Sequence, residues 1–500
     1  MPPIQYIDEP NLIVPLAASY NTRGILGYTQ AVTNADDQLK INSVYEPVMN
    51  SATGKATLYL CKRPGVTEFV STFSTSSNVS YLYEGSPGNF PLSGSGAVIF
   101  YTDGNDVRAA GRATSTNITT NAVGYAPAFA DSTLVSGKRH LVVQLRAGTG
   151  TSATQTVWWT SSTTMAAGVF QEVAGVGQPF GKMEFMDGYG FVLSGHTTIR
   201  NSALNTISTW AAANYISRQV KQDLGSGLAR LGKQLIAFGE STMEVFRNAG
   251  NPFGSPLESV PHLSQNYGLA DTNVAGMRHY YAELGGRIYW RGTNPHGVFA
   301  YNGENVEKIS TPAIDKILAE RQHYFVGRIG FSGQTAIVIG LDLVTATTQR
   351  ALLFFPSWKD WFIWESTTFI PQTNGIYENL CLGTSGNQHR LYAIATSTST
   401  FQDDGANYTW THQFKLPKRG NSFQKMDMFG LVGDTASTSH LINVQFSDDD
   451  YASFTTARTI DMSGTDKMIT RCGGYRSRAV KLSYAGDQQL RIEAAMARVS

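Results

Sequence analysis

The sequence LIAFGESTMEVF, residues 235–246, decides the fold class of this chain. Apolar and aromatic residues flank a short Gly-containing turn, which is typical of a strand, a tight turn and a second strand. The same texture continues in RIYW (residues 287–290) and GVFAYNG (residues 297–303), again separated by glycine-rich turns. The sequence therefore predicts an all-β fold.

Composition supports strands joined by turns. Charged residues make up 15% of the 500 residues, against about 25% in average soluble proteins, and glycine is plentiful, with 49 residues. The length exceeds that of a usual single domain, so we expect one large body and a smaller module. The formal net charge of +1 lacks the basic surplus of a protein that holds nucleic acid through its phosphates, although local basic patches remain compatible with it.

Strand and turn units recur from about residue 94 at intervals of roughly 40 to 55 residues, the range of a four-stranded propeller blade. Asp103-Gly104 and Asp187-Gly188 mark hairpin turns, and residues 141–145 are expected to pair with residues 156–159. A β-sandwich with the same turn chemistry is the alternative, and the pattern favours the β-propeller. Further units are expected to start near Gly232, Gly285, Gly333 and Gly383.

Helix is scarce. Residues 312–321 are the best candidate, because Thr311 can cap the first turn, Pro312 suits the first helical position, and apolar residues 314, 317 and 318 form one stripe. Residues 210–224 could be helical or an extended connection.

Three regions follow from these patterns. Residues 1–90 form an N-terminal arm with strands that close the ring. Residues 91–400 form a β-propeller-like body, and residues 401–500, after a polar break, form a C-terminal β-sandwich module.

Motifs of the commonest enzymes are missing: there is no Gly-x-Ser-x-Gly elbow, Walker loop, His-Glu-x-x-His or Rossmann fingerprint. The nine histidines are dispersed, and Asp448–Asp450 suits a turn better than a calcium loop. Cys61, Cys381 and Cys472 are odd in number and far apart, which indicates buried free thiols. We expect no catalytic site, no metal and no cofactor.

Trp358, Trp361 and Trp364 could suggest a stacking platform for sugars or nucleotides. Residues three apart point to opposite faces of a strand, so the three side chains cannot form one stripe. The sequence favours packing of these tryptophans in a blade core.

Basic side chains cluster at a few places and could contact phosphates or form ion pairs with a neighbouring subunit. The candidate ring or DNA-channel contacts are Lys415, Lys418, Arg419, Arg476 and Arg478.

The order of these motifs resembles the tail-nozzle (tail hub) proteins of short-tailed bacteriophages (podoviruses), the group of packaged-DNA stabilisation or head-completion proteins. Members show a Phe-Gly turn followed by Ser-Thr-x-Glu-x-Phe, met here by residues 238–246. A Gly-containing loop, an aromatic strand, a Gly hairpin and a short helix follow, matched by residues 268–318. The early Arg63-Pro64-Gly65 and the closing strands of residues 476–492 also fit.

This resemblance implies a structural virion protein. It implies a homohexameric ring below the portal and head-to-tail adaptor that retains packaged DNA, conducts it during ejection, and docks tail fibres, spikes or a plug. Near neutrality suits such a conduit, because many phosphate contacts would make DNA release slow. The alternative is a glycan-binding or glycan-cleaving β-propeller of a tail spike, which would need a convergent acidic pair or an Arg triad in a pocket.

The sequence also carries an expectation about location. Residues 1–6 lack the basic start and apolar core of a signal peptide, and no run of about 18 apolar residues follows. We expect a chain with no membrane anchor that is assembled into the virion tail in the bacterial host cytoplasm.

Overall fold

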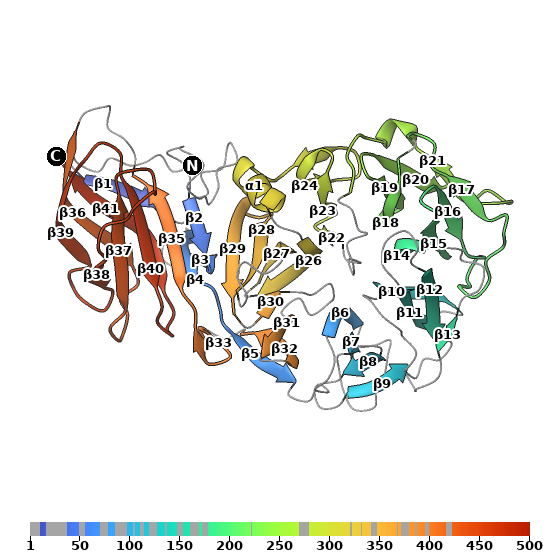
Figure 1. Cartoon of the computed structure of the whole chain (residues 1–500), viewed down its shortest axis with the longest axis horizontal. Coiled ribbons are helices and arrows are strands. Elements are labelled where there is room, and N and C mark those ends of the chain that lie inside the picture. Colours follow the sequence, from blue (N-terminus) through green and yellow to red (C-terminus); the bar gives the residue numbers. More distant parts are fainter. Residues whose placement is uncertain are drawn as a thin grey trace.

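The computed structural model describes residues 179–500 except 222, 270–279, 321–322, 332, 342–347, 368, 372–379, 386–387, 396–399 and 417–422. Before residue 179 it describes residues 11–16, 38–49 and 56–70 and the eight strands β6 to β13. The regular elements of the described residues are almost all strands, as predicted, and the body is a β-propeller beside a β-sandwich (Figure 1).

Five antiparallel four-stranded sheets follow one another along the chain and around the ring in Figure 1. In each sheet the strands lie in sequence order, which is the connectivity of a propeller blade. The first two blades are β6 (Val79–Gly85), β7 (Val98–Asp103), β8 (Asp106–Ala110), β9 (Ser115–Thr119) and β10 (Ala128–Val135), β11 (Lys138–Ala147), β12 (Thr154–Thr160), β13 (Phe170–Glu172). The next three are β14 (Pro179–Met186), β15 (Tyr189–Ser194), β16 (Thr198–Asn201), β17 (Tyr215–Ser217); β18 (Gly225–Leu231), β19 (Gln234–Gly239), β20 (Met243–Asn248), β21 (Leu257–Ser259); and β22 (Tyr281–Leu284), β23 (Arg287–Thr293), β24 (His296–Tyr301), β25 (Val306–Lys308).

Two further blades complete the ring within the described parts of the chain. A short 3-10 helix, η2 (Pro261–Leu263), follows β21, and helix α1 (Pro312–Glu320) leads into the sixth blade. The sixth blade is β26 (His323–Phe331), β27 (Gln334–Leu341), β28 (Gln349–Phe355) and β29 (Asp360–Ser366). The seventh combines β30 (Phe369–Pro371), β31 (Leu380–Ser385) and β32 (Gln388–Ile394) with β5 (Val66–Val70) from the N-terminal region.

Strand β5 joins the two ends of the propeller. It pairs antiparallel with β32, from Ile394 opposite Val66 to Leu391 opposite Val70. On its other edge it meets β33 (Gln402–Asp403), which forms a small hairpin with β34 (Ala406–Asn407). Because β6 directly follows β5 along the chain, the first and last blades are tied together by a single N-terminal strand.

The C-terminal module packs two sheets face to face. One contains β3 (Ser43–Met49), β4 (Ala56–Lys62), β41 (Arg491–Val499), β36 (Gln424–Gly433) and β39 (Met468–Tyr475), with β1 (Asn11–Pro15) along β41. The other contains β35 (Trp410–Lys415), β40 (Ala479–Tyr484), β37 (Leu441–Ser447) and β38 (Arg458–Asp461). Buried side chains of both sheets, among them Phe429, Val444 and Leu482, share one core.

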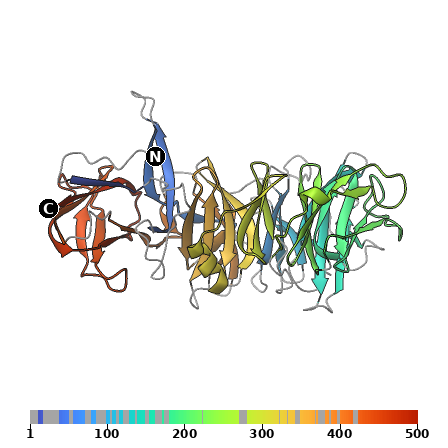
Figure 2. The same cartoon turned by 90° about the horizontal axis from the view of Figure 1, so that it is seen from above.

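Strand β2 (Gln38–Ile41) connects the propeller and the sandwich. One edge pairs with β29 of the sixth blade at Ile41 and Ile363, and the other pairs along its whole length with β35. The result is one nine-stranded sheet that runs from a blade into the sandwich. Figure 2 shows the two bodies side by side along the long axis.

The strands before residue 90 thus do not form a separate unit. Strands β1, β3 and β4 belong to the sandwich, β5 to the last blade, and β6 to the first blade. The N-terminal region is thus shared between the two bodies, whereas the C-terminal strand β41 lies in the sandwich.

Local predictions from the sequence are confirmed. The hairpins at residues 103–106 and 186–189 form, residues 142–145 pair with residues 156–159, and α1 spans Pro312–Glu320. Residues 210–224 contain the short strand β17 and turns instead of a helix, because Gly225 already begins the next blade. The predicted repeat was one strand out of phase: Gly232, Gly285 and Gly333 lie in the first hairpin turn of a blade, and Gly383 lies inside β31.

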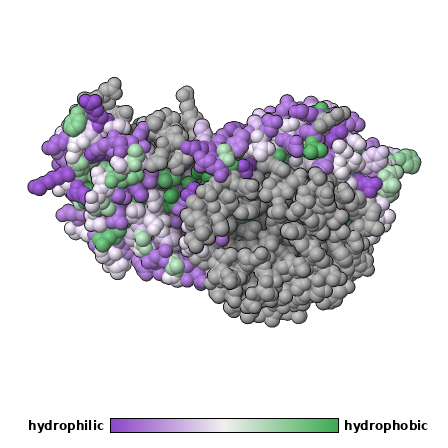
Figure 3. All heavy atoms as spheres, in the orientation of Figure 1, coloured by the Kyte–Doolittle hydropathy of each residue, from purple (hydrophilic) through white to green (hydrophobic). Residues whose placement is uncertain are grey.

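On the face seen in Figure 3, the described residues are mostly hydrophilic, with scattered apolar side chains. Among these residues, no helix is both long and apolar enough to cross a membrane.

Candidate functional site

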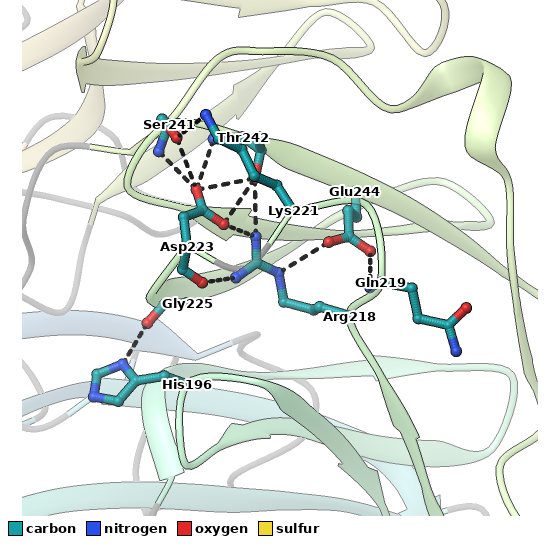
Figure 4. A network of polar contacts seen from close by, with 9 residues as sticks. All are labelled: His196, Arg218, Gln219, Lys221, Asp223, Gly225, Ser241, Thr242 and Glu244. Atoms are coloured by element: carbon teal, nitrogen blue, oxygen red, sulfur yellow. Dashed lines mark hydrogen bonds and ion pairs between the residues drawn. The ribbon is translucent and has the colours of Figure 1, made fainter.

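The family-like motif of residues 238–246 lies at the turn between β19 and β20, against the connector from the preceding blade (Figure 4). Asp223, on that connector, accepts hydrogen bonds from the amide of Ser241 at 2.9 Å and the amide of Thr242 at 3.0 Å. Arg218 donates to Asp223 Oδ1 at 2.8 Å and to Thr242 Oγ1 at 3.1 Å. We call Arg218, Asp223, Ser241, Thr242 and Glu244 the interblade joint.

Glu244 gives this joint a second carboxylate. Its side chain is fully buried, accepts the Gln219 amide at 2.9 Å and lies 3.6 Å from Arg218 Nε. Burial alone would raise the pKa of Asp223, but the Ser241 amide and the Arg218 guanidinium outweigh burial and hold that pKa below its ordinary value. The motif therefore holds two blades together through charged hydrogen bonds, and its Ser, Thr and Glu all contribute.

Two positions beside the interblade joint require glycine, because neighbouring atoms lie too close for a side chain. A Cβ on Gly239 would lie 2.3 Å from Asp223 Oδ2 and 2.5 Å from Arg218 Nη2. A Cβ on Gly268 would lie 1.9 Å from the carbonyl oxygen of Glu240. Both glycines of the motif pattern therefore serve blade packing.

A second buried network lies where β5 closes the ring. Arg63 is fully buried and makes a bidentate pair with Asp403, with donor to acceptor distances of 2.6 and 2.9 Å. Arg63 Nε donates to Asn42 Oδ1 at 3.0 Å, and Ser366 Oγ donates to Asp403 at 2.9 Å. We call Asn42, Arg63, Ser366 and Asp403 the closure joint.

Two lysines join the propeller to the sandwich. Lys40 Nζ lies 2.5 Å from Asp360 Oδ2, and the Tyr45 hydroxyl donates to the same oxygen at 2.7 Å. Lys62 Nζ donates to the carbonyls of Phe401 at 2.9 Å and Gly486 at 2.5 Å, and burial lowers the pKa of Lys62 to about 7. These contacts bind β2 and β4 to both bodies.

Two of the predicted channel contacts are already paired within the chain. Lys415 forms an ion pair with Asp450, and Arg478 forms a bidentate pair with Asp448 at 2.7 Å for both bonds. The structure thus brings both cations to one acidic turn, and their side chains are buried. Arg476 is exposed, and Lys418 and Arg419 lie outside the described residues.

Other predictions on side chains are confirmed. Trp361 and Trp364 are buried in different core clusters on opposite faces of β29, and Asp448–Asp450 form a turn. Cys61 and Cys472 are buried free thiols, whereas the side chain of Cys381 is outside the described part. The expected absence of a metal site stays a prediction; across the residues that the structure describes, His, Cys, Asp and Glu side chains form no group that could hold a metal ion.

Sequence reasoning missed both joints. Arg218 and Asp223 are only five residues apart and lie near the motif of residues 238–246. Their spacing could have indicated an ion pair. Arg63 and Asp403 are 340 residues apart, and nothing in either local sequence links them.

Two of the solved structures that match the chain resemble it only distantly. A structure assigned as a 6-phosphogluconolactonase from Bacteroides fragilis has 15% identity and a TM-score of 0.36, and the match covers 65% of this chain and 96% of that one. An exo-β-1,3-galactanase from Phanerochaete chrysosporium has 8% identity and a TM-score of 0.29, with coverage of 87% and 100%. Likenesses this weak support no conclusion about activity. The search of curated proteins finds no match.

The comparison with protein families is decisive. The family described as "Bacteriophage P22 Gp10, beta-propeller" matches residues 37–342, which is more than half of the 500-residue chain. This range contains Gly239 and Gly268, all residues of the interblade joint, and Arg63 of the closure joint. The chain belongs to the bacteriophage P22 Gp10 β-propeller family.

Proposed function

We propose that this chain is a subunit of the tail nozzle of a short-tailed bacteriophage. Six copies form a ring below the portal and head-to-tail adaptor, retain the packaged DNA and conduct it on ejection. The ring also carries the tail fibres, spikes or plug. The observation that carries the proposal is the family match over residues 37–342.

The joints support a mechanical role. The interblade joint and the closure joint place charged hydrogen bonds where blades or chain ends would separate under load. In both joints the arginine side chain is at most 2% exposed, so water competes little for these bonds.

The charge distribution supports a conduit that does not hold DNA tightly. The net charge is +1, and Lys415 and Arg478 are neutralised by Asp450 and Asp448. A conduit that makes few phosphate contacts binds DNA with weak salt dependence and releases it fast. In this proposal the subunit works without catalysis or a cofactor.

The test is reconstitution on phage heads. Purified protein is mixed with DNA-filled heads that lack the tail tip, then imaged by electron microscopy while DNA leakage is measured. We expect a six-fold ring at one vertex and suppressed leakage. Complete virions, whose tail vertex is occupied, are the control and should bind no additional ring.

The opposite result has a clear meaning. Heads of the matching phage that bind no protein and leak unchanged would overturn the nozzle proposal. That result would favour the glycan-directed tail-spike propeller instead.

A further inference from the structure

A depression of about 250 Å³ opens on the surface of the sandwich, and none of its lining residues belongs to either joint. It lies between the β36–β37 loop and the β40–β41 loop, beside the end of β38. Its lining residues are Asp434, Thr435, Ala436, Ser437, His440, Met462, Gln488, Gln489, Leu490 and Arg491. We call it the loop pocket.

The lining of the loop pocket is mostly polar. Met462 and Leu490 lie beneath it as buried side chains, and Ala436 is partly buried beside them. Hydroxyl, amide, imidazole and charged groups line the opening. The hydroxyls of a sugar need both donors and acceptors, and this lining supplies both.

The rim is fixed before any ligand arrives. Asp461 accepts the Ser439 hydroxyl at 2.7 Å and the His440 amide at 3.0 Å, and the Ala436 amide donates to the Met462 carbonyl at 3.1 Å. His440 stacks on Tyr484 with an interplanar angle of 8°. Such prior ordering reduces the entropy lost on binding.

His440 has a defined tautomer. Its Nδ1 lies 2.8 Å from the Thr438 carbonyl oxygen, which can only accept, so Nδ1 carries the proton. In the neutral ring Nε2 is then an acceptor.

Charge at the rim argues against an anionic ligand. Arg491 donates to Glu46 from Nε at 2.8 Å and lies 3.5 Å from Asp434. Lys467 donates to Thr435 Oγ1 at 2.8 Å and to the Gly433 carbonyl at 3.0 Å. Two cations face two carboxylates, which leaves no positive surplus for a phosphate or carboxylate.

We propose that the loop pocket binds a neutral sugar unit of a glycan. The volume, just below the ~300–1,000 Å³ of pockets for drug-sized ligands, limits the occupant to one or two sugar units. Asp434 is the one carboxylate in the lining, and a hydrolase would need a pair, so the pocket binds sugar without cleaving it. This inference does not rest on the nozzle proposal.

Saturation-transfer NMR on the purified full chain tests it. The probes are D-glucose, D-galactose, D-mannose, L-rhamnose and N-acetyl-D-glucosamine, each at about 10 mM to detect millimolar affinity. We expect saturation transfer to at least one sugar. The signal should fall at least tenfold in Ser437→Trp, which fills the pocket, and in Gln488→Ala, which removes an amide from the rim.

Ser437 and Gln488 are exposed, so both variants should fold. Thr456→Ala, at an exposed site of the same module, is the matched control. Absence of transfer to every sugar, or transfer that survives Ser437→Trp, overturns the proposal. Inorganic phosphate that displaces the sugar would overturn the assignment of a neutral ligand. Ser437→Trp should still form rings on phage heads, so the two proposals can fail separately.

Discussion

The interblade joint and the closure joint use the same chemistry at very different sequence separations. Each is built on a buried arginine–aspartate pair, but Arg218 and Asp223 are five residues apart, whereas Arg63 and Asp403 are 340 apart. Each doubling of loop length costs about 0.6 kcal/mol, so the roughly six doublings between the two separations cost roughly 4 kcal/mol. The closure joint must therefore stabilise a contact that the chain forms at far greater entropic cost.

The largest effect is expected at the closure joint. Asp403→Ala leaves Arg63 buried without its charge partner, which should lower the free energy of unfolding by about 3–5 kcal/mol. Asp223→Ala should cost less, about 1–3 kcal/mol, because Arg218 keeps Glu244 nearby. Urea midpoints followed by tryptophan fluorescence compare the two, and equal shifts would show that Glu244 does not compensate for the loss of Asp223.

A steric change at the interblade joint should have an intermediate effect. Gly239→Ala places a Cβ 2.3 Å from Asp223 Oδ2 and must displace the Arg218 pair, at a cost of about 1–3 kcal/mol. Gly464→Ala is the matched control, since its Cβ would lie 3.4 Å from the nearest atom. Thermal unfolding of both variants tests whether Gly239→Ala lowers stability more than Gly464→Ala. Similar melting temperatures would contradict the steric explanation.

A fall in pH should affect the sandwich, where His412 lies, before it affects the interblade joint. His412 in β35 is buried between Trp410 and Phe414, and no hydrogen-bond partner of its ring nitrogens appears among the described atoms. Burial, and then the charge of Lys40, lowers the pKa of His412 well below its ordinary value. The folded state therefore binds fewer protons than the unfolded state below pH ~6.5, and stability falls by up to about 1.4 kcal/mol per pH unit.

The pKa of Asp223 is also lowered, but its contribution is lost only as pH falls below the ordinary aspartate range. Between pH 6.5 and 4.5, unfolding should therefore become easier in the wild type and change less in His412→Phe. Melting temperatures across this range test the difference. A parallel fall in both proteins would assign the acid sensitivity to other groups.

The smallest effect is expected at an exposed pair in the same blade as the interblade joint. Arg247 and Glu258 lie 3.0 Å apart with side chains 62% and 52% exposed. Arg247→Ala should change the unfolding free energy by less than about 0.5 kcal/mol, because water screens the pair. A loss comparable to that of Asp223→Ala would mean that burial does not decide the strength of these pairs.

The sequence predicted what is local. Hairpin turns, α1 and the opposite faces of Trp361 and Trp364 follow from periodicities of two and 3.6 residues. It predicted that strands of residues 1–90 close the ring, but it could not identify β5 as the strand in the last blade or place β2 between the bodies, because their partners are hundreds of residues away. The same limit applies to Arg478, a candidate channel contact whose partner Asp448 lies 30 residues earlier.

The position of β2 bears on how this chain can be divided. Both edges of β2 are hydrogen-bonded, one to the sixth blade and one to the sandwich, and β5 completes the seventh blade. A fragment of residues 91–400 would lack β6 as well as β2 and β5, and would expose the edges of β7, β29 and β32 as unpaired donors and acceptors. Exposed edges of this kind pair with other copies, so we expect the isolated propeller fragment to aggregate unless residues 38–85 are supplied as a separate peptide.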